Sequence, residues 1–265
     1  MKLFQVDAFT DTPFAGNPAG VCILDELRPD AWMTSVAREM NLSETAFLRQ
    51  SGSGYDLRWF TPTTEVSLCG HASLASAHII WQERLVAETQ SISFSTKSGL
   101  LLARKAADAI EMDFPARSVQ SRDSNPELNR SLGITPSFTG SFAGPKGEIF
   151  LLQVGTDREV KGIVPDYHLL RSTSARAVIV TSPSSNPAYD FVSRYFAPAV
   201  GIDEDPVTGS AHCYLAPFWS ARLGKQRLTG YQASQRTGMV TCTFLGDRVL
   251  LAGKAVTVFR AELLV

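Results

Sequence analysis

The most distinctive polar stretch of the chain is Asp-Glu-Asp-Pro-Val-Thr-Gly-Ser at residues 203–210. Pro206 holds the preceding Asp205 in an extended conformation, and Thr208, Gly209 and Ser210 follow with hydroxyl groups and backbone donors. Acids before a helix also fit ordinary charge complementarity with the helix dipole. As a simple cap the motif would be over-elaborate, so it predicts an anion-binding loop with a carboxylate at its edge.

Glu44 and His71 are of types that suit proton transfer. Glu44 lies in Asn-Leu-Ser-Glu-Thr-Ala-Phe, between a predicted helix and a strand, where a desolvated carboxylate suits a general acid or base. Its local sequence alone favours a solvent-facing glutamate at a strand edge. His71 follows Gly70 at the start of an apolar segment, and a helix N-terminus there would favour a neutral imidazole that exchanges a proton. A structural histidine is an equal alternative for His71, and His78 and His212 are expected in the core.

Asn17 and Cys69 are further candidates. Asn17 lies in the turn sequence Gly-Asn-Pro-Ala-Gly, where its amide serves either the backbone of the loop or a ligand. Cys69 directly precedes the same apolar segment, and a helix N-terminus there would activate a thiolate. A two-thiol mechanism would require a second cysteine in the repeat described next, where Thr208 or Pro206 stands instead.

An internal repeat indicates which elements position these residues. Arg-aromatic-Phe-x-Pro occurs at residues 58–62 and again at 194–198, an offset of 136 residues. Each copy is followed by an apolar segment that begins with glycine, at Gly70 and at Gly209, an offset of 139 residues. Short matches of this kind arise by chance, but an ordered series of matching features favours a duplication.

The repeat predicts two related domains, each a sheet around one central helix. Both glycine-led segments are rich in alanine and apolar on nearly every side, which is typical of a helix buried all round. We therefore expect a domain at 1–117 with its helix near 70–84, and a domain at 118–265 with its helix near 209–222. The polar, weakly patterned residues 115–125 are the expected linker.

Most of the remaining chain alternates or is rich in β-branched residues, which predicts strands. The strands are expected at 2–9, 20–24, 45–49, 92–96, 100–104, 109–114, 149–154, 177–181, 239–244, 248–251 and 255–265. Shorter helices are expected at 30–40 and at 126–132, the second with Asn125 as its N-cap and a proline in first position.

Composition excludes several classes of protein. A hydrophobic content of 44% and a charged content of 19% are typical of a globular chain with a substantial core. A net charge of -1 without a basic stripe argues against nucleic acid and anionic membranes as partners. The four cysteines are widely spaced and predict reduced thiols rather than disulfides or a zinc site. The strand-like start lacks the apolar run of a signal peptide, so we expect a cytoplasmic protein.

Several blocks of the chain resemble the PhzF-like (phenazine biosynthesis-like) family. They occur in family order at residues 6–19, 41–45, 60–72 and 204–211. The resemblance implies an α+β fold of the diaminopimelate epimerase-like type, in which two pseudo-symmetric domains each wrap a barrel-like mixed β-sheet around a central helix. The resemblance also allows terminal strands to be exchanged between the halves. The stretch after Gly230 departs from the family pattern, so the resemblance does not define the outer wall of the substrate pocket.

The resemblance also implies a function and its residues. It implies an isomerase without a cofactor or metal, acting on a small anionic substrate that carries a carboxylate, in a cleft between the domains, and a homodimer. Glu44 would be the acid/base, with His71 and Asp205 as further catalytic residues. The residues expected to bind substrate are Asn17, Gly70, Gly209 and Ser210. The alternatives are a non-catalytic binding protein for an anionic metabolite and a Cys69-dependent racemase or hydrolase.

Overall fold

The chain folds into two compact units. A computed structural model describes residues 1–144 and 147–265. The first unit contains Met1–Phe114 and Leu250–Val265, and the second contains Pro115–Val249. The chain therefore leaves the first unit after Phe114 and returns to it at Leu250.

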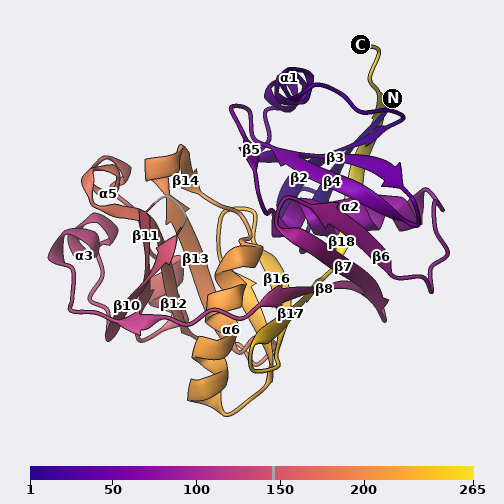
Figure 1. The fold of residues 1–265 in the computed structure, drawn as a ribbon. Helices are drawn as coiled ribbons and strands as arrows, with labels where there is room; N and C mark the ends of the chain where they lie inside the picture. The colour runs from indigo at the N-terminus through magenta and orange to yellow at the C-terminus, as the bar shows by residue number, and fades with distance from the viewer. Residues whose placement is uncertain (145–146) are drawn as a thin grey trace. The chain divides into compact units, whose positions relative to one another are not determined.

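The first unit is a mixed sheet around one helix (Figure 1). Its elements are β1 (Lys2–Ala8), β2 (Asn17–Leu24), α1 (Asp30–Met40), β3 (Glu44–Ser51), β4 (Gly54–Phe60), β5 (Glu65–Val66), α2 (Gly70–Gln82), β6 (Ile92–Thr96), β7 (Gly99–Ala106), β8 (Ala109–Pro115) and β18 (Ala255–Glu262). Helix α2 contacts β1, β2, β3 and β18, and nearly all its side chains are buried. An apolar helix of this kind is stable because it is covered on every side.

The second unit has its own central helix, α6 (Figure 1). Its elements are β9 (Gln120–Ser121), α3 (Pro126–Leu132), β10 (Phe138–Gly144), β11 (Gly147–Gln153), α4 (Asp157–Lys161), α5 (Tyr167–Ser172), β12 (Ala175–Pro183), β13 (Phe191–Ala197), the short 3-10 helix η1 (Pro198–Val200), β14 (Ile202–Glu204), α6 (Gly209–Leu223), β15 (Arg227–Gln232) and β16 (Gly238–Phe244). Strand β17 (Arg248–Gly253) begins in this unit and continues into the first, to which the chain returns at Leu250. The side chain of Asn125 caps α3 by accepting from the backbone N–H groups of Glu127 and Leu128.

Strand pairing follows one scheme in both units. In the first, β1 is antiparallel to β2, β2 parallel to β3, β3 antiparallel to β4, β4 antiparallel to β5 and parallel to β6, and β6 antiparallel to β7. In the second, β10 to β16 repeat the same directions in the same order. The repeated pairing supports a duplication, and the predicted α+β fold class is confirmed.

The two ends of the chain meet in the first unit. Strand β18 pairs along the whole of β1. Figure 1 shows the marked N-terminus beside the last part of the chain. The N-terminal ammonium group donates to the Leu263 carbonyl at 3.0 Å, and the Leu263 N–H donates to the Met1 carbonyl at 2.8 Å. β1 is thus an inner strand, paired on both edges.

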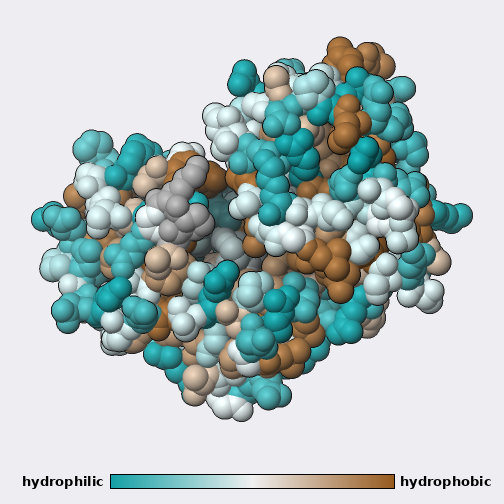
Figure 2. Space-filling view, viewed as in Figure 1, coloured by the Kyte–Doolittle hydropathy of each residue, from teal (hydrophilic) through white to brown (hydrophobic). Residues whose placement is uncertain are grey.

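The face of the molecule drawn in Figure 2 is largely hydrophilic, and its exposed apolar side chains form small areas among hydrophilic ones. Among the described residues, no helix has both the length and the apolar character needed to cross a bilayer. All four cysteines are buried and none forms a disulfide. Burial raises the pKa of the Cys22 thiol to about 11 and that of Cys213 to about 12, so both remain protonated at neutral pH.

Candidate functional site

Glu44 lies at the start of β3 because of how α1 ends. Helix α1 stops at Asn41, which adopts a left-handed conformation (φ 52°) and donates its N–H to the Ala37 carbonyl. This reversal turns the chain directly into β3, where Glu44 pairs with Ala19 of the parallel strand β2. The Glu44 side chain is 16% exposed, so it is not the solvent-facing glutamate that its local sequence favours.

Glu44 faces His71 and Cys69. Its Oε2 atom lies 3.5 Å from Nε2 of His71, and the Cys69 sulfur lies 3.5 Å from Nδ1 of the same imidazole. His71 is 5% exposed. Burial lowers the pKa of His71 to about 4, so the ring is neutral at physiological pH and its donor and acceptor nitrogens depend on the tautomer. A carboxylate, a neutral imidazole and a thiol therefore meet at the N-terminus of α2.

Asn17 begins β2, at the same end of the sheet as Glu44. It is fully buried, and the loop before it is held by the buried Asp7, whose Oδ2 accepts from the Phe14 N–H at 2.7 Å. Gly16 has φ +66°, and a Cβ there would lie 2.3 Å from the Ala8 carbonyl oxygen. Only glycine fits this turn, which sets the position of Asn17.

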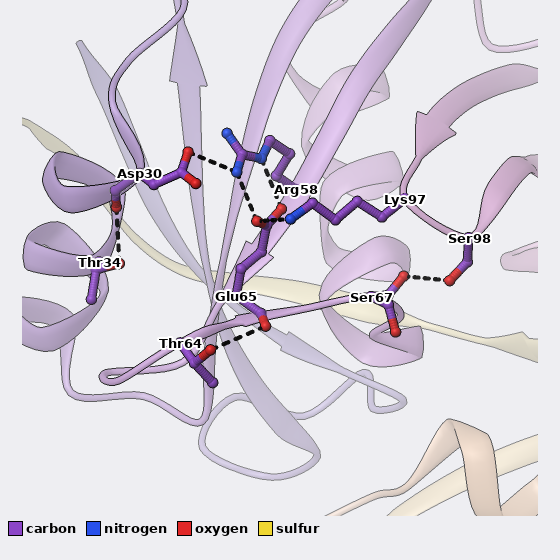
Figure 3. Close-up of polar contacts among 8 residues, drawn as sticks. All are labelled: Asp30, Thr34, Arg58, Thr64, Glu65, Ser67, Lys97 and Ser98. Atoms are coloured by element: carbon purple, nitrogen blue, oxygen red, sulfur yellow. Dashed lines mark hydrogen bonds and ion pairs between the residues drawn. The ribbon is translucent and has the colours of Figure 1, made fainter. Parts of the chain in front are cut away.

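The loop before α2 is anchored by a cluster of charges (Figure 3). The Arg58 guanidinium donates to both carboxylate oxygens of Glu65, at 2.8 and 2.7 Å, and also to Asp30. Arg58 is the main cause of a lowered pKa of Glu65, which Lys97 also contacts. In the same region, Ser98 donates its hydroxyl to the Ser67 carbonyl at 2.7 Å (Figure 3).

In the second unit, Asp205 is held by Thr208 and Gln232. The Thr208 hydroxyl donates to Oδ2 of Asp205 at 2.6 Å. The amide of Gln232, which is fully buried, donates to the Asp205 carbonyl at 2.7 Å and accepts from the Thr208 N–H at 2.9 Å. These bonds fix both the backbone and the carboxylate of the loop that precedes α6.

Two further contacts stabilise that loop. Ser234 donates its hydroxyl to the Pro206 carbonyl at 2.7 Å. The Asp205 N–H donates to the Tyr195 carbonyl at 3.0 Å. Burial, and after it the charge of Asp205, raises the pKa of Tyr195 to about 12, so the neighbouring phenol is neutral.

Both central helices begin without a side-chain cap. Cys69 and Thr208 are the N-cap residues of α2 and α6, and neither side chain accepts from the helix. The first N–H groups of any helix have no partner within it, so those at Gly70 and Gly209 are suited to bind an anion. Ser210, in the first turn of α6, is exposed.

The predicted site residues therefore form two sets. Glu44 and His71 are in contact in the first unit, where Asn17 and Gly70 also lie. Asp205, Gly209 and Ser210 lie together along the second unit's loop and helix start. His212 is fully buried, as expected for a core residue, whereas His78 is only partly buried and contacts Thr257 at 3.1 Å.

Gln232 is a residue that sequence reasoning missed. It ends β15, in which Leu228, Gly230 and Gln232 are buried and the residues between them are not. An amide at an inward position of an alternating strand is the signal that would have found it, because buried polar groups require partners.

The fold resembles that of a distantly related protein of known structure. A solved structure of a probable proline racemase from Agrobacterium radiobacter K84 has a TM-score of 0.65 at 10% identity, covering 99% of this chain and 92% of that one. This likeness shows the epimerase-like fold.

Closer comparisons then define the family. The family model described as phenazine biosynthesis-like protein matches residues 6–261. A putative phenazine biosynthesis PhzC/PhzF protein from Clostridium difficile has a TM-score of 0.91 at 38% identity, with each chain fully covered. A protein of Halalkalibacterium halodurans named as an uncharacterized isomerase is 50% identical, over 99% of this chain and 98% of its own. The chain belongs to the phenazine biosynthesis-like family.

Proposed function

We propose that this chain is an isomerase that moves a proton on a small carboxylate-bearing substrate without an organic cofactor. The single observation that carries the proposal is the contact of the partly exposed Glu44 carboxylate with the buried, neutral His71. Relatives at 50% and 43% identity are named as isomerases, which supports this class of reaction.

The substrate carboxylate binds at the helix starts. Backbone N–H groups at Gly70 and Gly209 receive it, with the Ser210 hydroxyl and the Asn17 amide as further donors. The family resemblance implies that the substrate bridges the two domains in a cleft, so that one ligand meets both sets of residues. Fixed donors of this kind cost no reorganisation during the reaction.

Glu44 is the base that carries the proton. It removes a proton from one carbon of the substrate and returns it at another position, so no electrons or groups leave the substrate. The neutral imidazole of His71 orients the substrate or passes the proton, and Asp205 acts from the second unit. Negative charge that develops on the substrate is stabilised by the same N–H donors that bind its carboxylate.

Replacement of Glu44 by Gln tests the assignment. The experiment measures deuterium incorporation from heavy water into a panel of small amino and hydroxy acids. The Glu44→Gln variant should lose at least about 10²–10⁴-fold in exchange rate, because general-base catalysis contributes that much. The matched control is Glu88→Gln, which removes an exposed carboxylate of the same unit.

The outcome also separates the proposal from a binding protein. A Glu44→Gln variant as active as the parent would refute the role of Glu44. Tight ligand binding by the parent without any solvent exchange would favour a non-catalytic binding protein for an anionic metabolite.

The contact of Cys69 with His71 favours one second candidate, a Cys69-dependent racemase or hydrolase. Thr208 stands at the corresponding N-cap of α6, so a partner thiol from that position is missing. If Glu44 is the base, Cys69→Ser should retain exchange to within about tenfold. Complete loss of exchange in this variant, and on alkylation of the parent, would support the thiol instead. A homodimer in the cytoplasm remains a prediction, which light scattering of the purified protein would test for the dimer.

A further inference from the structure

Glu44, Cys69 and His71 form a cluster of metal-ligand side chains that the sequence did not reveal. A carboxylate oxygen, the sulfur and an imidazole nitrogen all lie within 4.8 Å of one another. Within residues 1–144 and 147–265 no other three such groups meet this criterion. Carboxylate, thiolate and imidazole are the three ligand types that zinc uses in proteins.

The distances fit a tetrahedral ion. With Zn–N and Zn–O bonds near 2.1 Å and a Zn–S bond near 2.3 Å, donor atoms are separated by about 3.3–3.6 Å. Nε2 of His71 is 3.5 Å from Glu44 Oε2 and 4.0 Å from the Cys69 sulfur. The sulfur and the carboxylate must approach by up to about 1 Å, which rotation of these two side chains permits.

The surroundings favour a soft cation over a hard one. Cys69 and His71 are 7% and 5% exposed, and they flank the first residue of α2, so their positions are set by the helix. The partly exposed Glu44 leaves the cluster open to solvent on one side. A thiol and an imidazole select zinc-like cations, whereas magnesium prefers oxygen ligands and keeps its water.

We infer that Glu44, Cys69 and His71 bind Zn²⁺ or a similar thiophilic divalent cation reversibly, and that the bound ion inhibits the enzyme. The thiol releases its proton to solvent on binding, and a water molecule or the substrate carboxylate takes the fourth position. The ion is coordinated by the Glu44 carboxylate, which the proposed reaction needs as a free base. The inhibition rests on the proposed function, but the binding site does not.

Metal binding is measured first, without any substrate. The whole chain is stripped with a chelator and titrated calorimetrically with Zn²⁺, and separately with Cd²⁺, whose ultraviolet charge-transfer band reports thiolate coordination. Cys69→Ala should abolish the band and weaken Zn²⁺ binding by at least about tenfold, since loss of even an indirect contact to a metal costs that much. Cys22→Ala, which removes a buried thiol of the same unit, should retain both signals.

Inhibition is measured second, as solvent-deuterium exchange with and without saturating Zn²⁺. Exchange should stop, return when chelator is added, and be unaffected by Mg²⁺. Absence of the Cd²⁺ band in the parent, or full Zn²⁺ affinity in circular-dichroism-verified Cys69→Ala, would overturn the site. Exchange that continues with the site saturated would overturn inhibition. If the metal-free chain exchanges nothing, the proposed function fails while the binding result stands.

Discussion

Arg58 in the first unit and Arg194 in the second occupy the same position of the repeat and make the same contact. Each donates through Nε and Nη2 to both oxygens of one glutamate, Glu65 or Glu204, at 2.7–2.8 Å. Each glutamate stands five residues before the glycine that begins the central helix. The pair joins an inner strand to the loop that leads into the helix.

A second contact is repeated as closely. Ser98 donates to the Ser67 carbonyl and Ser234 to the Pro206 carbonyl, each at 2.7 Å and each to the residue three positions before the glycine. Both units thus hold an uncapped helix start with the same two anchors.

The side chains near these two anchored helix starts differ between the units. Thr45 pairs with Phe60 and Val178 with Phe196, so Glu44 corresponds to Ala177, an apolar residue. At the offset of 139 residues, Asp205 corresponds to Val66, Cys69 to Thr208 and His71 to Ser210. Each unit has a carboxylate where the other has an apolar side chain. The repeated anchors therefore fix where a ligand binds in each unit, whereas a few side chains determine the chemistry that the ligand undergoes.

The largest expected difference between the units lies in the two arginines. Arg194 and Glu204 have side chains only 10% and 15% exposed, and Arg194 also donates to the Val160 and Ile163 carbonyls. Arg194→Met should lower the free energy of unfolding by about 3–5 kcal/mol, because it leaves a buried charge unpaired. Arg58→Met should cost about 1–2 kcal/mol, because Glu65 keeps Lys97. Urea unfolding measures the free energy of unfolding of both variants. Equal losses would show that the two arginine–glutamate pairs contribute equally to stability and would contradict this prediction.

The next effect is a loss of stability in acid that both units share. Burial lowers the pKa of His71 and of His212 to about 4, from 6.5 when exposed. Between these values the unfolded chain binds a proton that the folded chain does not. The contribution of the two neutral histidines to the free energy of unfolding is therefore complete above pH 6.5 and is lost as the pH decreases toward 4. Each histidine should contribute a loss of about 2 kcal/mol between pH 7 and pH 5.

Urea unfolding of His212→Gln at the two pH values checks the sign and the size. The variant should show a smaller pH-dependent loss than the parent, whatever its stability at pH 7. His168→Gln removes an exposed imidazole of the same unit and is the control. An unchanged pH dependence in His212→Gln would contradict the assignment.

The last effect concerns the contrast between the loops that precede the two central helices. Gln232→Ala leaves the Asp205 carbonyl and the Thr208 N–H without their partner, and should cost about 1–3 kcal/mol of stability. If Gln232 positions Asp205, the variant should also raise KM for the exchanged substrate more than it lowers kcat. Thr96 occupies the corresponding strand position, and Thr96→Ala is the matched control, expected to leave KM unchanged. A loss of stability in Gln232→Ala with unaltered KM would make Gln232 purely structural.

Much of the fold was predictable because it depends on local patterns. Helices α1 and α3 begin and end at the predicted residues, since a helix end at Asn41 and a cap at Asn125 are short-range signals. Helices α4 and α5 were missed because they are too short for a periodic pattern to develop. Strand β15 was missed since Gly230 interrupts it, and a Cβ there would lie 2.5 Å from the Phe191 ring.

The candidate site was predictable as a set of residues but less so as a geometry. Local sequence left Glu44 at a solvent-facing edge, and only strand register and the end of α1 bring it to His71. One partner of Asp205, Gln232, lies 27 residues further along the chain, so local spacing could not identify it. The catalytic roles themselves remain predictions.

The pairing of β1 with β18 has a consequence for the order of folding. Residues near the start of the chain are bound to residues near its end, while the second unit is one uninterrupted stretch between them. During synthesis on a ribosome, the edge of β1 that pairs with β18 therefore stays unpaired until β18 has emerged. Contacts of long sequence separation, such as those between β1 and β18, form slowly. The strands of the inserted second unit emerge earlier, so this unit is expected to fold first.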